Sequence, residues 1–84
     1  MASAWFVCDR DGELLRRESS HDTAREWAMS YSNTTAVASC HEIERNDYWY
    51  VLVDPAHPTT HCQLRILSSD RATAIGIDAD PLTA

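Results

Sequence analysis

The segment richest in potential metal ligands is DPAHPTTHC, residues 54–62. His57 and His61 are separated by three residues, which is the spacing of the second half of a Cys₂His₂ zinc finger. Upstream, Cys40 and His41 are adjacent, where a zinc finger has two cysteines separated by at least two residues. The spacing therefore matches only half of a zinc-binding motif.

The strands expected on both sides limit which of these residues can bind one ion. Successive side chains of a strand point to opposite faces, so Cys40 or His41, but not both, can join a site. The same limit holds for His61 and Cys62. One interpretation is a small zinc-binding module that uses Cys40/His41 with His57 and His61/Cys62. We favour the alternative, in which Cys40 and Cys62 pack as small apolar groups and the two histidines lie on an exposed loop. We therefore expect no metal or other cofactor.

Nucleophilic catalysis has no specific motif to support it. Cys62, His57 and Asp54 supply the residue types of a catalytic set, but such sets are recognised by geometry, and many chains contain these types. The chain has only two glycines and lacks a nucleophile elbow, a glycine-rich phosphate loop and an HExxH motif. A chain of 84 residues also has little room for a deep substrate cleft. We predict a protein that is not an enzyme and has no catalytic residues.

A group of acidic and aromatic residues offers a different kind of chemistry. Glu42, Glu44 and Asp47 lie close in sequence to Tyr48 and Tyr50. Acidic side chains can steer a basic partner, and tyrosines supply contact area at interfaces. The alternative is an ordinary solvated surface that keeps the fold soluble and protects strand edges. We predict that these five residues form a partner-binding site.

The overall charge agrees with a basic partner. Thirteen acidic residues oppose seven arginines, and the net charge is −6. Direct nucleic-acid binding is not expected, because a basic surface is needed to neutralise phosphates. No apolar run approaches the roughly 18 residues of a membrane span. The N-terminal stretch MASAWFVCD lacks the basic region and long apolar run of a signal peptide, so we expect a cytoplasmic protein with reduced cysteines.

The clearest predicted element is a helix over about 22–32. Ser20 or Asp22 can cap its N-terminus, and Thr23 with Glu26 has the spacing of a capping box. Asn33 can end the helix in the left-handed conformation. An apolar stripe with helical spacing faces the core, with Trp27 expected at its centre; its members are Ala24, Trp27, Ala28 and Tyr31.

The other segments predict an antiparallel sheet. Strands are expected at 4–8, 13–18, 34–44, 48–54 and 61–67, with tight turns at 9–12 and 45–47. Pro55 and Pro58 indicate a crossover between strands. Residues 68–72 are expected to turn the chain, and 73–78 to add an edge strand through which copies of the chain could pair. The prediction is a single small α+β domain over 1–84: an antiparallel sheet of four to five strands, one helix on one face and a frayed tail at about 79–84.

The order of these elements resembles that of a known group of proteins. The capped helix in SSHDTAREWA, followed by the hairpin VASCHEIERNDYWYVLVD, is similar to the β-α-β-β core of small phage and mobile-element proteins. This group includes some anti-CRISPR inhibitors of type I effector complexes. The resemblance covers residues 19–54 and rests on element order and aromatic placement. It implies an inhibitor without enzymatic activity, but the related layout uses basic residues where this chain is acidic. No individual contact residue carries over.

These observations lead to one hypothesis. We expect a small acidic protein-interaction module, of the phage inhibitor type, that binds a basic surface of a nucleic-acid-handling complex. The protein is expected to be a monomer or a small homo-oligomer that contacts neither membrane nor nucleic acid directly.

Overall fold

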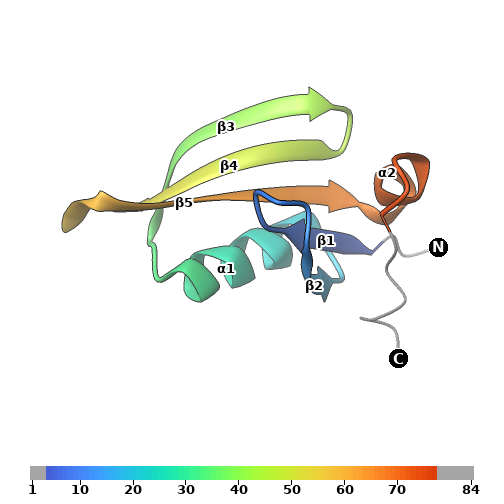
Figure 1. Cartoon of the computed structure of the whole chain (residues 1–84). Helices are drawn as coiled ribbons and strands as arrows, with labels where there is room; N and C mark the ends of the chain where they lie inside the picture. Colours follow the sequence, from blue (N-terminus) through green and yellow to red (C-terminus); the bar gives the residue numbers. More distant parts are fainter. Residues whose placement is uncertain (1–3, 78–84) are drawn as a thin grey trace.

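A computed structural model describes residues 4–77, which form a five-stranded antiparallel sheet and two helices. The elements in chain order are β1 (Trp5–Cys8), β2 (Leu14–Glu18), α1 (His21–Ser32), β3 (Ala36–Glu44), β4 (Asp47–Asp54), β5 (His57–Ser68) and α2 (Ser69–Ala74). The strand order across the sheet is β2-β1-β5-β4-β3, so β5 is central and β2 and β3 are the edges (Figure 1). This confirms the predicted α+β class. The predicted tail at 79–84 lies outside the described residues.

Two hairpin turns follow directly from local sequence. After β1, the Asp9 Oδ1 atom accepts hydrogen bonds from the backbone N–H groups of Asp11 (2.9 Å) and Glu13 (2.8 Å). Gly12 completes this turn with a φ of +89°, a conformation that residues with a Cβ adopt only at a cost. Between β3 and β4, Asn46 has a φ of +62°, which asparagine tolerates better than most residues. Both predicted turns are confirmed.

The connection after β4 differs from the prediction. Residues 55 and 56 form a tight turn, and β5 begins at His57, so the segment is part of a hairpin and not a crossover. The turn is closed by Asp54 Oδ1, which accepts the Ala56 N–H at 3.0 Å. Proline suits such a turn because its fixed φ is already close to the required value. Val53 pairs with His61 and Asp54 with His57, so the register of β4 with β5 shifts between these two pairs.

Helix α1 begins one residue before the predicted start. Ser20 is its N-cap and forms a capping box with Thr23, each side chain accepting the other's backbone N–H at 3.2 Å. The sequence predicted a capping box between Thr23 and Glu26, whereas in the structure it forms three positions earlier, between Ser20 and Thr23. Asn33 ends the helix in the left-handed conformation, with a φ of +58°, as predicted.

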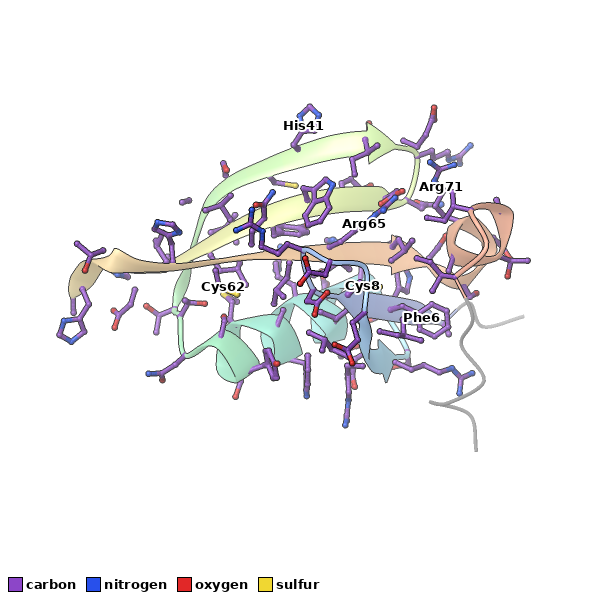
Figure 2. The ribbon with its side chains drawn as sticks, viewed as in Figure 1. Phe6, Cys8, His41, Cys62, Arg65 and Arg71 are labelled. Carbon is purple, nitrogen blue, oxygen red and sulfur yellow. The ribbon has the colours of Figure 1, made fainter. Side chains whose placement is uncertain are left out.

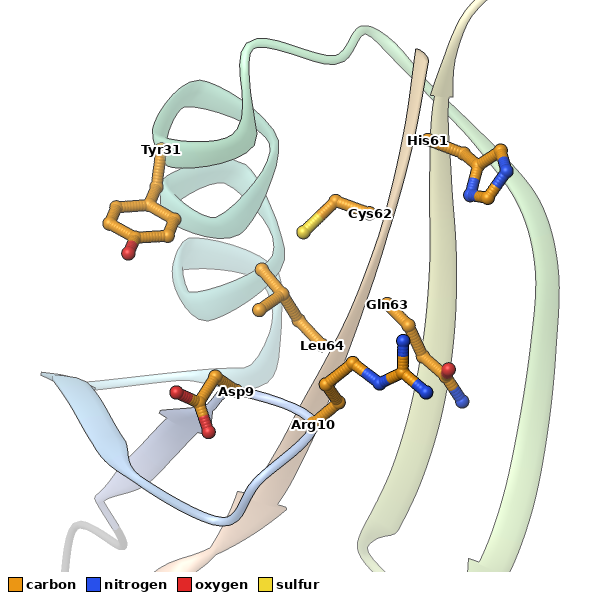
Figure 3. A pocket seen from close by; sticks show the side chains of 7 residues that line it. All are labelled: Asp9, Arg10, Tyr31, His61, Cys62, Gln63 and Leu64. Carbon is orange, nitrogen blue, oxygen red and sulfur yellow. The ribbon is translucent and has the colours of Figure 1, made fainter. Parts of the chain in front are cut away.

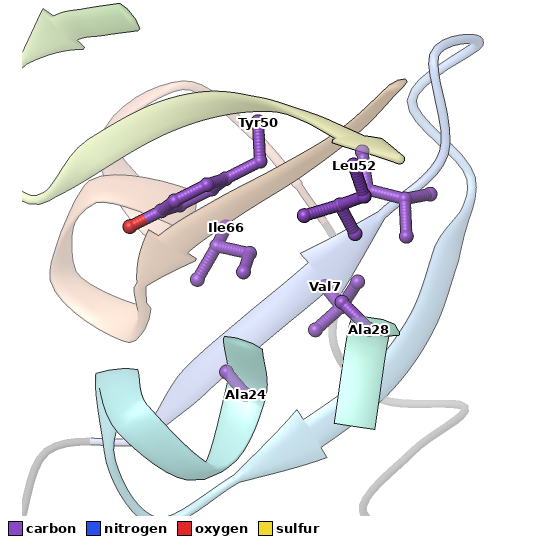
Figure 4. Close-up of a cluster of buried hydrophobic side chains, with 7 residues drawn as sticks. Val7, Ala24, Ala28, Tyr50, Leu52 and Ile66 are labelled. Atoms are coloured by element: carbon purple, nitrogen blue, oxygen red, sulfur yellow. The ribbon is translucent and has the colours of Figure 1, made fainter. Parts of the chain in front are cut away.

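The main core lies between α1 and one face of the sheet. Ala24 and Ala28 are fully buried against Val7, Leu52 and Ile66 (Figure 4). Trp27 was predicted to be the central residue of this contact, but it is only half-buried, and its ring stacks on the exposed Tyr31 ring at 4.8 Å between centroids. Small side chains at the centre allow the helix to lie close to the sheet, and the larger aromatic ring lies beside the contact. Of the predicted stripe, Ala24 and Ala28 are buried as expected, whereas Trp27 is half-buried and Tyr31 is exposed.

Helix α2 replaces a predicted turn and strand. Residues 73 and 74 belong to this helix, so the described part of 73–78 forms no edge strand for pairing between copies. Ser68 caps α2 by accepting the Arg71 N–H at 3.2 Å. Ala72 packs with Phe6, Cys8 and Leu67 in a second cluster. These strand residues alternate with Val7 and Ile66, so α2 covers the face of the sheet opposite α1.

Candidate protein-interaction edge

Strand β3 is an edge strand with solvent on both faces along most of its length. It pairs with β4 on one side, and no other strand of residues 4–77 lies on its outer side (Figure 1). Every residue from Val37 to Glu44 is exposed, including the apolar Val37 and Ile43. An edge strand presents unpaired backbone N–H and C=O groups that can accept another strand. At nine residues, β3 is longer than the short edge strands by which many proteins limit such pairing.

Two irregularities divide this edge. The pairing of β3 with β4 shifts between Val37 and Ser39, and again between Glu42 and Glu44. Residues 39–42 between them pair in regular register with residues 48–51 of β4. Bulges at both ends twist an edge away from unwanted partners and leave a short regular section available. We call this section, Ser39–Glu42, the open section of β3.

Three of the five predicted partner-binding residues lie on the surface, on or beside the open section. Glu42 and Glu44 are exposed, and Tyr48 is half-buried. Glu42 lies directly opposite Tyr48 in the β3–β4 pairing, so the two side chains share a face. Burial and then the neighbouring Glu42 carboxylate raise the pKa of Tyr48 from its ordinary value. Tyr48 is therefore a neutral hydroxyl group beside an acid at neutral pH.

The other two predicted residues cannot contact a partner in this conformation. Asp47 has 0% of its surface exposed and Tyr50 has 4%. The Asp47 carboxylate accepts hydrogen bonds from Arg65 Nε and Nη2 and from Arg71 Nε, at 2.8, 2.6 and 2.9 Å. The two arginines, which are labelled in Figure 2, belong to β5 and α2. Asp47 thus connects the start of β4 to two later elements, and its side chain is not accessible to a partner in this conformation.

Tyr50 is held by a residue that the sequence analysis did not identify. Its hydroxyl group lies 2.7 Å from Nε2 of His21, the first residue of α1. The His21 ring also lies 5.2 Å from the Trp5 ring and 5.3 Å from the Tyr48 ring, measured between centroids. Burial and then neighbouring Cys40 raise the pKa of Tyr50 to about 12. Tyr50 is therefore a structural contact between sheet and helix, and only Tyr48 of the two tyrosines remains accessible.

The sequence contained a signal for His21. It precedes Ala24 by three positions and Ala28 by seven, so helical periodicity places it on the face that packs against the sheet. The predicted helix began one residue too late, at position 22, which left His21 outside the pattern.

The cysteines and histidines considered for a metal site lie apart. Cys40 is on the exposed edge strand, and Cys62 is half-buried, facing α1 from β5 (Figure 2). His61 pairs with Val53 and His41 with Trp49, four positions apart on β4, which separates the two histidines by roughly 13 Å along the strand direction alone. Within residues 4–77, no three His, Cys, Asp or Glu side chains converge in a way that could hold a metal ion. The expectation that Cys40 packs as a buried apolar group is wrong, because it is exposed.

No protein-family model, curated protein or solved structure matches this chain. In the part of the chain that the structure describes, neither helix has the length and apolar character to cross a membrane.

Proposed function

We propose that this chain is a non-enzymatic protein-interaction module that adds a basic, extended segment of a partner protein to its sheet at the open section of β3. The observation that carries the proposal is the nine-residue edge strand, exposed on both faces, with a regular section between two bulges. Main-chain hydrogen bonds to such an edge supply affinity, and side chains on alternate positions supply specificity.

Charge favours a basic partner over a second copy of the chain. Glu42 and Glu44 lie on or beside the open section, and the whole chain has a net charge of −6. Two copies of the chain carry the same net charge, which opposes their approach, and a parallel pairing of two β3 strands would also place Glu42 beside Glu42. A basic segment meets the same acids favourably, and its approach is accelerated by the field of the whole protein.

The resemblance discussed above suggests a class of partner. Complexes that handle nucleic acids carry basic surfaces, and acidic side chains can occupy such a surface in place of phosphates. In this proposal the protein inhibits such a complex, as phage-type inhibitors do, by occupying part of its basic surface.

Binding of a strand-forming basic peptide tests the proposal. The probe is a labelled, end-capped peptide, Thr-Arg-Val-Arg-Val-Arg-Thr, and its control carries N-methyl groups at alternate residues, which remove backbone donors without changing charge. Fluorescence anisotropy is expected to show saturable binding of the probe and weaker binding of the control. The double substitution Glu42→Lys and Glu44→Lys is expected to weaken binding by about tenfold or more.

A matched variant separates the effect of the acidic residues on β3 from the effect of the net charge of the chain. Glu26 and Asp70 are exposed acids on the two helices, and their replacement by Lys changes the net charge by the same amount. This control is expected to weaken binding much less than the β3 variant. Equal effects of the two double variants, or equal binding of the N-methylated peptide, contradict the proposed site.

A further inference from the structure

Strand β5 has a second unpaired edge inside the sheet. β5 has twelve residues, but β1 pairs only with Arg65–Ser68. After Cys8 the chain leaves the sheet through the turn that begins at Asp9. As a result, His61–Leu64 pair with β4 on one side, and no strand of residues 4–77 lies on their other side. Beyond Cys8, the position beside β5 that an extension of β1 would occupy therefore holds no strand of residues 4–77.

A cavity occupies this empty position. It measures about 350 Å³ and is open to solvent. We call it the β5 slot; its lining residues are Asp9, Arg10, Tyr31 and His61–Leu64 (Figure 3). The volume lies within the range of about 300–1,000 Å³ typical of ligand sites. Four residues of free edge span roughly 13 Å, which is the length of a short extended peptide.

The two sides of the slot differ in chemistry. Cys62 and Leu64 point toward α1 and Tyr31, whereas His61 and Gln63 point to the other face of the sheet (Figure 3). Burial raises the pKa of the Cys62 thiol, which keeps it neutral and suits an apolar contact better than a nucleophile. Leu64 is buried, with 2% of its surface exposed, so the accessible apolar groups on the side toward α1 are the half-buried Cys62 and the exposed ring of Tyr31.

Asp9 adds an acidic group at the β1 end of the slot. Its Oδ1 atom accepts the two turn hydrogen bonds, whereas Oδ2 accepts none from residues 4–77. Its carboxylate points toward the same side as Cys62 and Leu64 (Figure 3). Arg10 also lines the slot, but its side chain is directed toward Gln63, on the other side from Asp9 (Figure 3). A cationic side chain in the slot therefore has a free carboxylate oxygen available to it.

We propose that the β5 slot binds a short extended segment of another protein with the pattern basic-x-apolar, which continues the line of β1 and runs antiparallel to β5. Residues i and i+2 of a strand lie on one face, about 6.6 Å apart, so the basic side chain reaches Asp9 while the apolar one contacts Cys62 and Tyr31. Backbone groups of the segment pair with the free edge of His61–Leu64, as in strand addition to other sheet edges. The site is separate from β3, and the proposal does not depend on the proposed function.

Residue-resolved NMR with a defined probe tests this proposal. The probe is the end-capped peptide Thr-Lys-Thr-Val-Thr, titrated into the ¹⁵N-labelled full chain. Saturable shifts of backbone amides are expected at His61–Leu64 and at Asp9, with slower hydrogen exchange of the paired amides. Absence of shifts at His61–Leu64, or shifts confined to Ser39–Glu42, overturns the proposal.

A charge-removing variant tests the contact with Asp9. Asp9→Asn keeps the Oδ1 acceptor of the turn, and Glu26→Gln, on the exposed side of α1, is the matched control. Asp9→Asn is expected to weaken binding of the lysine peptide by about two- to fivefold, and Glu26→Gln to leave it unchanged. Replacing lysine by norleucine in the peptide is expected to weaken binding to the wild-type protein equally and to abolish the effect of Asp9→Asn. If Asp9→Asn weakens both peptides alike, the proposed contact is wrong.

Discussion

The carboxylate of Asp47 and the guanidinium of Arg65 form a two-point ion pair across β4 and β5, with Nε–Oδ1 and Nη2–Oδ2 distances of 2.8 and 2.6 Å. Arg71 of α2 adds a third hydrogen bond to the same carboxylate. Planar groups in this arrangement bind strongly and specify geometry. The pair therefore fixes the start of β4, next to the β3–β4 turn, relative to β5 and α2.

Loss of this carboxylate is expected to destabilise the fold. Asp47→Ala leaves two arginines without their partner, which in a fully buried site costs about 3–5 kcal/mol. Because Arg65 and Arg71 keep 20% and 27% of their side-chain surface exposed, water can compensate in part, and we expect a loss of about 2–3 kcal/mol in the free energy of unfolding. Urea unfolding followed by tryptophan fluorescence measures it. Glu42→Ala, at an exposed position, is expected to change stability by less than about 0.5 kcal/mol. Similar effects of the two substitutions contradict the structural role of Asp47.

The same carboxylate is expected to make the fold sensitive to acid. Burial tends to raise the pKa of Asp47, but the hydrogen bonds from Arg65 and Arg71 outweigh it, and the pKa lies below its ordinary value of 3.8. A lowered pKa stabilises the folded state above the unfolded value, and this contribution is lost as the pH falls through the folded value. The stability difference between wild type and Asp47→Asn is therefore expected to shrink as the pH falls below 3.8. A difference that is constant down to the acid transition contradicts this assignment.

Protonation of His21 is expected to change the stability of the fold in a higher pH range. Burial and then the charge of Arg25 lower the pKa of His21 from its ordinary value of 6.5, although Asp22 partly opposes the shift. The folded state therefore favours the neutral ring, and this stabilisation is complete above the unfolded value and is lost as the pH falls below 6.5. An NMR titration of the His21 ring is expected to give a midpoint below that of the urea-unfolded chain. A midpoint at or above the unfolded one contradicts the expectation.

The contact between His21 and Tyr50 is expected to contribute to stability. Tyr50→Phe keeps the ring but removes the hydroxyl group that lies 2.7 Å from His21 Nε2. The loss of one partly buried hydrogen bond is expected to cost about 1 kcal/mol in the free energy of unfolding. Tyr31→Phe is the control, because the Tyr31 side chain is 57% exposed. Equal stability of the two variants indicates that the His21–Tyr50 bond is not formed in solution.

The three cysteines are expected to react with iodoacetamide in a fixed order. Cys40 is exposed, Cys62 is half-buried, and Cys8 is fully buried with a pKa raised to about 11 by burial. Alkylation requires an accessible thiolate, so Cys40 reacts first and Cys8 reacts only after unfolding. Peptide mass spectrometry at successive times measures the order. Modification of Cys8 as rapid as that of Cys40 contradicts the position of β1.

Features set by neighbouring residues could be predicted from the sequence. The turns at Asp9–Gly12 and Asn46, the left-handed end of α1 at Asn33 and the buried stripe through Ala24 depend on the chemistry of a few adjacent residues. Helix α2 was missed because its single cap, Ser68, precedes only six helical residues, which are stabilised by packing of Ala72 on the sheet.

The candidate site depended on contacts that sequence order does not reveal. Glu42, Glu44 and Asp47 form one acidic cluster in sequence, yet Asp47 differs because its two partners lie 18 and 24 residues away. Tyr48 and Tyr50 occupy one face of β4, and both rings lie near His21 of α1, but Tyr50 is buried whereas Tyr48 is only half-buried. The alternation of side chains along β4 identified the face that the two tyrosines share. How deeply each ring is buried depends on contacts with other elements, which sequence order does not give.

The most direct test of the central proposal is an amide hydrogen-exchange experiment on the full chain with the arginine-containing peptide. Strand addition at β3 predicts slower exchange of those Ser39–Glu42 amides that point outward, and no slowing with the N-methylated control. The protection is expected to disappear in the variant with Lys at positions 42 and 44. Binding of the peptide without any protection in Ser39–Glu42 contradicts β3 as the interaction edge.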